Sequence, residues 1–271
     1  IVSKERLWST TIGVAYNANV FRPRDYDSAV GVPSSLEIRV GAFNNTVDSS
    51  VQRFADDGRP GDAVDIEAVL GVPERDTTLQ ADVIMRFAFY HRIEASYFEF
   101  LRRSSTVLER DVVIGDEIFL AGTEVDTSQD SETLQFMYGY SLWRDAQKEL
   151  GVTAGLHYTR SDLILFAEET SQEVRVETEV PLPTIGAFAS VMLPNHWSVH
   201  GEARAFALEF DRYEGNMGFF SVRLERDFGE HFAAGIGFNY YSTRLESQEP
   251  SLRGVYKATR YGPLFYIGAQ F

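Results

Sequence analysis

The last stretch of the chain reads Tyr261-Gly262-Pro263-Leu264-Phe265-Tyr266-Ile267-Gly268-Ala269-Gln270-Phe271. Apolar, mostly bulky side chains occupy every second position of this stretch, from Tyr261 to Phe271. Successive side chains of a β-strand point to opposite faces, so a repeat of two residues is the period of a strand. The stretch therefore predicts a β-strand with one continuous apolar face, and the rest of the sequence must explain what that face contacts.

The composition excludes several classes of protein. None of the 271 residues is a cysteine, which rules out disulfide frameworks and thiolate metal sites. The formal charge of −15 repels nucleic-acid phosphates, so no nucleic acid is expected as a partner. No run approaches the ~18 to 20 consecutive apolar residues that a membrane-spanning helix needs. A transmembrane β-barrel lacks that signal, because only every second residue of its strands faces lipid.

Alternating segments of the same kind recur along the chain, and counting back from Phe271 gives about ten. The expected strands are Ser35–Phe54, Thr78–Phe89, His91–Val107, Glu132–Leu142, Glu149–Ala167, Val176–Leu193, Trp197–Phe210, Met217–Glu225, His231–Leu245 and Leu252–Phe271. Bacterial barrels have an even number of strands, so we predict an all-β fold, a transmembrane antiparallel up-and-down barrel. A β-sandwich with an aromatic core is the alternative, but its strands would be shorter, about 5 to 6 residues.

Short and long connections alternate between these strands. The short turns at 89–91, 143–146, 194–196 and 226–231 fall on the side of Phe271, which we assign to the periplasm. The opposite side carries longer connections rich in Asp and Glu, namely Ala55–Asp76, Leu108–Ser131 and Glu168–Arg175. Short periplasmic turns with longer extracellular loops are typical of outer-membrane barrels. We therefore expect acidic loops at the cell surface.

One strand carries an irregularity. Pro181-Leu182-Pro183 shifts the alternation of the strand Val176–Leu193 by one residue. Prolines inside sheets are confined to edges and bulges, because they lack an N–H donor. We interpret this segment as a β-bulge.

The first part of the chain does not fit the ten-strand pattern. An alternating segment, Trp8–Val20, would make eleven strands. We therefore expect residues 1–34 to be an N-terminal extension that acts as a periplasmic segment, a lumen plug or an interface strand, and residues 35–271 to form the barrel. A twelve-strand barrel, with the twelfth strand inside Ala55–Asp76, is the alternative. Because the chain starts at Ile1 without a charged and apolar leader, we expect a mature chain whose signal peptide has been removed.

Short motifs along the chain carry a family resemblance through their order. They are Val64-Asp65-Ile66-Glu67-Ala68-Val69-Leu70-Gly71, Arg86-Phe87-Ala88-Phe89-Tyr90-His91-Arg92, Ser96-Tyr97-Phe98, Arg103-Ser104, Ile114-Gly115-Asp116, Ala121-Gly122-Thr123, Tyr138-Gly139-Tyr140-Ser141, Glu149-Leu150-Gly151 and Ala154-Gly155-Leu156-His157. In this order they resemble an uncharacterised family of proteobacterial outer-membrane β-barrel proteins, from about Ser35 to Phe271. The resemblance implies a barrel in the bacterial outer membrane and transfers no substrate, reaction or active site. Phe271 is similar to the assembly signal of such barrels, which implies the barrel assembly machinery as a partner of the last strand.

The inward faces of the predicted strands carry charges of both signs. The expected lumen residues are Glu37, Arg39, Asp82, Arg86, Glu94, His157, His200, Glu202, Arg204, Arg223, Glu225 and Arg260. Charges in a narrow interior must be paired or hydrated, so we expect a salt-bridged network. A barrel of about ten strands is only slightly wider than the ~8-strand barrels whose side chains fill the interior. The network either fills the lumen or lines a narrow pore for small ions or solutes.

The sequence carries no catalytic motif, so we expect no enzyme. His157, Thr159 and Ser161 share one strand face, but that face is directed inward, away from lipid substrates. None of the five histidines falls in a predicted outer loop, where an omptin-type protease would need one. We predict a structural or interaction protein with a largely filled polar lumen and acidic surface loops. The alternatives are a narrow channel and, third, an outer-membrane hydrolase acting on lipid A or peptides.

The expected partners follow from the location. We expect outer-membrane lipids and lipopolysaccharide around the barrel, and a protein partner through residues 1–34 or the acidic loops. No cofactor is expected. The loops lack the Asp-x-Asp-x-Asp-Gly pattern of a dedicated calcium site, so metal binding stays open. Diffuse Mg²⁺ or Ca²⁺ bridging between loop carboxylates and lipopolysaccharide phosphates is the milder hypothesis, and solvated charges are the default.

Overall fold

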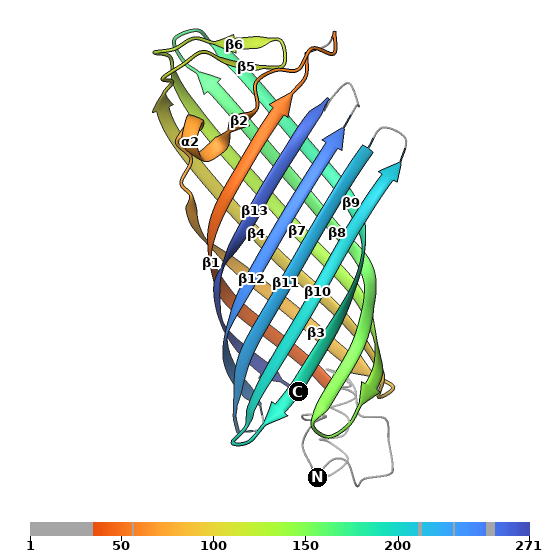
Figure 1. The fold of residues 1–271 in the computed structure, drawn as a ribbon. Coiled ribbons are helices and arrows are strands. Elements are labelled where there is room, and N and C mark those ends of the chain that lie inside the picture. Colours follow the sequence, from red (N-terminus) through yellow and green to blue (C-terminus); the bar gives the residue numbers. More distant parts are fainter. Residues whose placement is uncertain (1–34, 56, 211–212, 230, 248–252) are drawn as a thin grey trace, which may run out of the picture.

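The computed structural model describes residues 35–55, 57–210, 213–229, 231–247 and 253–271. The predicted extension, residues 1–34, lies outside the described residues, together with its alternating segment Trp8–Val20. Within the described chain, no helix has the length and apolar character needed to cross a membrane. The described chain forms one tall antiparallel barrel with a small helical and hairpin structure at one end (Figure 1).

Ten long strands make the wall of the barrel, each hydrogen-bonded to its neighbours. They are β1 (Ser35–Arg53), β3 (Arg75–Phe87), β4 (His91–Val107), β7 (Glu124–Arg144), β8 (Lys148–Ala167), β9 (Gln172–Leu193), β10 (Trp197–Phe210), β11 (Tyr213–Phe228), β12 (Phe232–Ser247) and β13 (Gly254–Gln270). The predicted ten-strand up-and-down barrel is confirmed. The connections hold three further short strands, β2 (Val64–Asp65), β5 (Val112–Ile114) and β6 (Glu117–Phe119), and one helix, α2 (Ile66–Leu70). The twelve-strand alternative is wrong, because β2 pairs with β1 over two residues only and is too short to form part of the wall.

The barrel closes where the last strand meets the first. β13 pairs antiparallel with β1, for example Ile267 with Val40. Beyond β13, the Phe271 N–H donates to the Leu36 carbonyl at 2.8 Å, and the Leu36 N–H donates to the Phe271 carbonyl at 3.0 Å. The backbone of Phe271 thus belongs to the closing ladder, while its role as an assembly signal stays a prediction.

The outer face of the barrel is apolar over much of its height. Exposed side chains on strands around the barrel include Val40, Leu79, Phe136, Ile185 and Ile267, each at least 50% exposed. Large aromatic side chains, among them Trp143, Phe228 and Phe232, are exposed near the short turns. Such an apolar band with interfacial aromatics is what a barrel presents to lipid.

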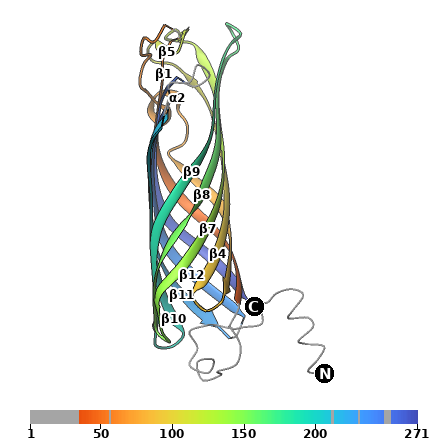
Figure 2. The same ribbon diagram turned by 90° about the vertical axis from the view of Figure 1, so that its right-hand side faces the viewer.

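The predicted strand ends differ most from the structure on the extracellular side. β7 begins at Glu124, eight residues before the predicted start at Glu132, and β9 begins at Gln172 instead of Val176. The outward side chains of the added part of β7 are Glu124, Asp126, Ser128 and Asp130, which are polar because this part of the strand stands above the apolar band. A loop-like composition therefore concealed a strand. The two views of the barrel show how far the wall rises at this end (Figures 1 and 2).

The predicted β-bulge at Pro181-Leu182-Pro183 is wrong. The β8/β9 ladder runs through it without a shift, with Pro183 opposite Leu156 and Pro181 opposite Tyr158. The irregularity lies on the other edge of β9, where pairing with β10 stops at Ile185. Pro181 and Pro183 therefore lie just beyond the end of the β9/β10 ladder and do not form a bulge. A register shift does occur in β7, between Ser141 and Trp143.

The turn between β7 and β8 is held by one carboxylate. Asp145 accepts hydrogen bonds from the backbone N–H groups of Gln147 and Lys148, both at 2.8 Å, and from the Trp143 indole at 3.0 Å. The backbone hydrogen bonds from Gln147 and Lys148 lower the pKa of Asp145 below its usual range. The ionised side chain thus closes a short turn at the end of the barrel where Phe271 lies.

We predict that Asp145→Ala lowers the free energy of unfolding at pH 7, because three donors lose their acceptor. The folded-state pKa of Asp145 is depressed, so its contribution is full above the unfolded-state pKa and is lost as pH falls through the folded-state value. The difference between wild type and variant should therefore shrink on acidification, in urea unfolding followed by tryptophan fluorescence. Trp143→Phe removes only the indole donor, so this variant should keep the pH dependence of the wild type. A difference between wild type and Asp145→Ala that stays constant down to acid pH would contradict this account.

Candidate functional site

The lumen is divided into three cavities along the barrel axis. The cavity near the short turns has a volume of about 70 Å³, the middle one about 40 Å³ and the one toward the loops about 350 Å³. The first two share Glu94, Glu202 and Arg223 as lining residues, so these side chains lie between them. The middle and upper cavities are separated in the same way by Phe98, Tyr241 and Arg260.

A cluster of charges occupies the periplasmic end of the lumen. Arg39 lies 2.5 Å from the carboxylate of Glu37 and 3.4 Å from that of Glu225. Tyr266 donates to Glu225 at 3.0 Å, and the guanidinium of Arg39 lies 5.5 Å from the centre of the Tyr266 ring. His200 lies 3.8 Å from Glu225. These contacts join β1, β10, β11 and β13.

A second ion pair lies at the same end. Arg86 on β3 donates to Glu149 on β8 at 2.6 Å, and Glu149 also accepts from Ser141 at 2.5 Å and from Ser190 at 3.5 Å. The pair joins strands that are not neighbours in the sheet. It therefore spans the lumen as a strut instead of following the wall.

The centre of the network is Arg204 on β10. Its guanidinium donates to Gln135 at 2.6 Å, to Glu94 at 2.6 Å and to Glu202 at 3.0 Å. Glu94 is also paired with Arg92. Because Glu94 lies on β4 and Gln135 on β7, Arg204 connects opposite sides of the barrel. The Arg204 and Glu94 side chains are each 6% exposed, so both charges depend on each other for compensation.

A chain of neutral groups continues from this centre toward the loops. Gln135 is hydrogen-bonded to the Tyr241 hydroxyl, and that hydroxyl contacts Nδ1 of His157 at 3.2 Å. The Tyr241 ring packs 4.8 Å, centre to centre, from Phe219. Tyr241 and His157 line the upper cavity and form its floor, whereas Gln135 and Phe219 line the middle cavity below.

The extracellular connections fold into a cap, which we define as residues 57–74 and 108–123. The cap holds α2 and the β5/β6 hairpin, seen at the top of Figures 1 and 2. The two connections are joined by the hydrogen bonds of Asp62 and Val113, at 3.0 and 3.1 Å. Apolar side chains of the cap pack against the upper ends of the wall strands and bury a common core, which comprises Val51, Val64, Ile66, Leu70, Val72, Leu108, Val112, Ile114, Phe119, Val125, Leu163, Leu165, Ala167, Val174 and Val176.

One buried ion pair anchors the cap to the wall. Arg102 on β4 donates to Glu67 of α2 at 2.7 Å and to the Pro73 carbonyl at 3.0 Å. Glu67 also accepts from the N–H and the hydroxyl of Ser49 on β1, both at 2.7 Å. Arg102 is further hydrogen-bonded to Gln129 on β7. The short helix is thus pinned at the mouth of the barrel by three strands.

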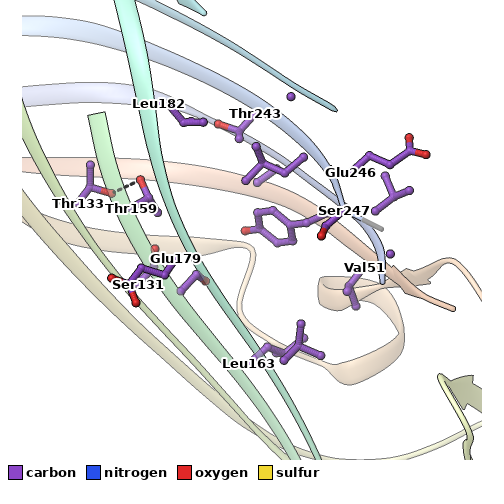
Figure 3. A pocket seen from close by; sticks show the side chains of 18 of the residues that line it. Val51, Ser131, Thr133, Thr159, Leu163, Glu179, Leu182, Thr243, Glu246 and Ser247 are labelled. Carbon is purple, nitrogen blue, oxygen red and sulfur yellow. Dashed lines mark hydrogen bonds between the residues drawn. The ribbon is translucent and has the colours of Figure 1, made fainter. Parts of the chain in front are cut away.

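Between the cap and the floor lies the 350 Å³ cavity. Figure 3 shows labelled side chains around it, with Thr133 hydrogen-bonded to Thr159 at 3.2 Å, and Leu163 and Leu182 among the apolar residues. Leu182 and Phe206 form a buried cluster with Met217, against which Leu245 packs. This part of the lumen is therefore more apolar than the network below it.

The structure places all twelve predicted lumen residues along the cavities. Eleven of them make ion pairs or hydrogen bonds described above or lie between cavities, as Arg223 and Arg260 do. Asp82 lines the middle cavity, and its two carboxylate oxygens accept hydrogen bonds from the Gln80 amide at 2.9 and 3.1 Å. Among the described residues it makes no ion pair. Arg260 lies over the Phe100 ring, with its guanidinium 3.6 Å from the ring centre. His157 faces the upper cavity.

Several residues of the site were missed from the sequence. Arg92 and Arg102 share the inward face of β4 with Glu94, at even-numbered positions, and Glu149 shares the inward face of β8 with His157. Strict alternation would have found these three. Glu67 could not be found in this way, because it lies on a helix inside a connection that carries no strand period.

Groups that could act in a hydrolase are not arranged for it. Thr159 is hydrogen-bonded to Thr133, and His157 to Tyr241. Ser198 lies 2.9 Å from Nε2 of His200, but Glu225 approaches the same nitrogen at 3.8 Å instead of orienting the other one. All five histidines belong to the described residues, and none lies in the cap. Within the described ranges, no group of three His, Asp or Glu side chains could hold a metal ion.

Comparison with known proteins identifies the fold. No family model matches the chain, and no curated protein matches it. The outer-membrane protease OmpT from Escherichia coli is similar in structure, with a TM-score of 0.58 at 8% identity over 90% of this chain and 99% of that one. Weaker likenesses are the outer membrane protein OprG from Pseudomonas aeruginosa (TM-score 0.40, 16% identity, 88% and 96% covered) and the attachment invasion locus protein Ail of Yersinia pestis (TM-score 0.37, 9% identity, 88% and 99% covered). The fold is that of bacterial outer-membrane β-barrels, and its apolar outer band fits the predicted location in the outer membrane.

We predict that Arg204→Met lowers the free energy of unfolding by about 3 to 5 kcal/mol, because it removes the guanidinium bound to the buried carboxylate of Glu202 and leaves Glu94 with Arg92 alone. Urea unfolding of the detergent-solubilised protein measures the change. The matched control is Arg244→Ala, which breaks the exposed pair of Arg244 with Glu246 at 3.3 Å. That control should cost at most about 1 kcal/mol, the range of surface ion pairs. Equal effects of the two substitutions would show that the lumen network does not stabilise the barrel.

Proposed function

We propose that the protein is a non-enzymatic interaction protein of the outer membrane, with a lumen closed by its own side chains and a cap that presents its binding surface. One observation carries the proposal. Arg204 on β10 binds Glu94 on β4 and Gln135 on β7, so charged side chains cross the barrel from wall to wall. The cavities above and below this crossing share lining side chains, which leaves little room for a continuous pore.

The charge balance of the lumen also favours a filled interior over a selective channel. Five carboxylates and five guanidiniums stand among the twelve lumen residues. Selective pores are lined by rings of one sign of charge, whereas alternating signs neutralise each other. The upper entrance is further narrowed by α2, which Arg102 and Glu67 fix in place.

The cap provides the surface for interaction. Its exposed carboxylates include Asp57, Asp65, Asp111, Asp116 and Glu117. An acidic surface beside lipopolysaccharide favours divalent cations between the two, as well as basic partner proteins. We include membership of the uncharacterised barrel family in this proposal, on the motifs quoted above.

The hydrolase alternative has less support. A protease of the same fold exists in OmpT, but its likeness to this chain concerns the fold alone. In this chain the histidines lie in the lumen or at the end of the short turns. A peptide or lipid A molecule at the cell surface would not reach them past the cap.

Single-channel recording in planar bilayers tests the closed lumen. The wild-type protein should insert without conductance steps, because its network blocks the path of hydrated ions. Arg92 on β4 also reaches across the lumen, with its guanidinium 3.3 Å from the centre of the Phe188 ring on β9. The double variant Arg92→Ala and Arg204→Ala should therefore show steps, provided that it remains folded by circular dichroism. The Arg244→Ala control should stay silent. Regular conductance steps from the wild type would overturn the closed-lumen proposal in favour of the narrow channel.

Thermal unfolding with and without a chelator tests the role of cations at the cap. In the presence of lipopolysaccharide and Mg²⁺, we expect the midpoint to fall when EDTA is added, because the carboxylates of the cap then repel the lipid phosphates. Asp111→Asn together with Asp116→Asn should reduce that shift. An unchanged midpoint would remove cation bridging from the proposal and leave the closed lumen unaffected.

A further inference from the structure

The wall between β9 and β10 is hydrogen-bonded over only part of its height. The ladder starts at Leu193 opposite Trp197 and ends at Ile185 opposite Ala205. Above this point β9 continues to Gln172 in full pairing with β8, and β10 continues to Phe210 in full pairing with β11. In the described residues, no pair joins β9 before Ile185 to β10. The wall therefore has an unpaired seam, which we define as 180–184 of β9 facing 206–210 of β10.

The sequence of β9 prevents this seam from closing. The N–H of Met192 donates to Gln147 before β8, at 2.7 Å, and the β8/β9 ladder shows no register shift. Even-numbered N–H groups of β9 therefore point toward β8, and odd-numbered ones toward β10. Pro181 and Pro183 are odd-numbered and have no N–H. Extending the ladder would place them opposite Glu209 and Ala207, where two donors would be missing.

The seam begins at the outer edge of the lipid-facing band. Ile185, the last paired residue of β9, is 69% exposed. On the neighbouring strand, Tyr158 stands opposite Pro181, and its hydroxyl is hydrogen-bonded to Glu179. Two pairs higher, on the same face, Arg160 stands opposite Glu179. The change from apolar to charged outward side chains places the seam at the level of the outer-leaflet head groups.

The 350 Å³ cavity lies directly behind the seam. Leu182 on β9 and Phe206 on β10 flank the seam from inside, and both line the cavity. Leu163, Val176 and Ala258 add apolar surface. Apolar side chains such as Ile84 and Phe188 also face the lower lumen, but there they lie beside ion pairs, whereas around the upper cavity the apolar side chains predominate. A volume of this size lies within the range of pockets that hold small ligands.

We propose that this cavity receives the hydrocarbon chain of a single-chain amphiphile, which enters sideways from the outer leaflet through the β9/β10 seam. The apolar cavity wall takes the chain, and the head group stays at the seam. Glu179 and Glu214 are exposed cavity residues on β9 and β11, so the seam favours an uncharged or cationic head group over an anionic one. Leu163 and Val176 belong both to the cavity lining and to the buried core under the cap, so the cavity borders the cap. The inference goes beyond the proposed function and does not require a closed lumen.

Photolabelling in lipid vesicles tests the binding. The probe is a monoacylglycerol with a diazirine at the end of its chain, mixed into phosphatidylcholine vesicles that contain the protein. After irradiation, mass analysis should find label on cavity residues such as Leu182, Phe206 and Leu163. Ala258→Phe and, independently, Leu163→Phe fill the cavity from different strands and should abolish that label while lipid-facing label remains. Label confined to lipid-facing positions in the wild type would overturn the proposal.

Cross-linking tests the path. The chain has no cysteine, so Pro183→Cys with Ala207→Cys can be joined by a short bifunctional thiol reagent without side reactions. Joining them should cause loss of cavity labelling, whereas the same variant before cross-linking should be labelled. The control is Phe136→Cys with Leu156→Cys, a pair on the fully paired β7/β8 wall at the height of Pro183, whose cross-linking should change nothing. Undiminished cavity labelling after closure of the seam would show entry from the cap side and overturn the lateral path.

A complementary variant restores the missing donors. Pro181→Thr with Pro183→Thr supplies the two N–H groups and allows the β9/β10 ladder to continue past Ile185. We therefore expect cavity labelling to be slower than in the wild type. The amide hydrogens of residues 181 and 183 should also exchange more slowly than that of residue 179, because they donate to β10. Labelling as fast as in the wild type, in a variant whose exchange shows the extended ladder, would contradict a role for the seam.

Discussion

The structure depends on one constraint: inside lipid, each backbone N–H and C=O group must find its partner within the protein. A sheet satisfies this only when its two edges meet, as β1 and β13 do from Leu36 and Phe271 upward. Closure separates two environments that alternate along every strand. Bulky apolar side chains turn to the acyl chains, and all polar side chains at the same height turn into a narrow interior, where only other polar side chains can compensate them.

That compensation explains the arrangement of the lumen. Arginine is suited to it, because a planar guanidinium can bind several acceptors at once. Arg204 binds three acceptors on β4, β7 and β10, and Arg102 binds α2, β1 and β7 in the same manner. The interior is thus organised around arginines that reach across it, and the apolar upper cavity is the part of the lumen where such residues are replaced by Leu182, Phe206 and Leu245.

Much of the barrel could be predicted from the sequence, because membrane barrels repeat one simple rule. The alternation located β4 and β10 to the residue and placed Glu94, Glu202 and Arg204 on inward faces. The rule fails above the membrane, where both faces of a strand are polar, so the start of β7 at Glu124 was hidden. It also fails for the cap, whose core forms between two connections that are far apart in sequence. The prolines of β9 were noticed, but a single sequence does not show which neighbouring strand a missing N–H would face.

The links across the barrel also bear on how the protein reaches its folded state. Glu94 on β4 and Arg204 on β10 are separated by 110 positions in the chain and by four strand-to-strand steps in the sheet. Until the sheet has curled into a cylinder, each charge has only a partner on its own strand, Arg92 for Glu94 and Glu202 for Arg204, so a half-built sheet lacks the links across the lumen. Such intermediates are less stable than the closed barrel, so curling of the sheet and completion of the charge network favour each other.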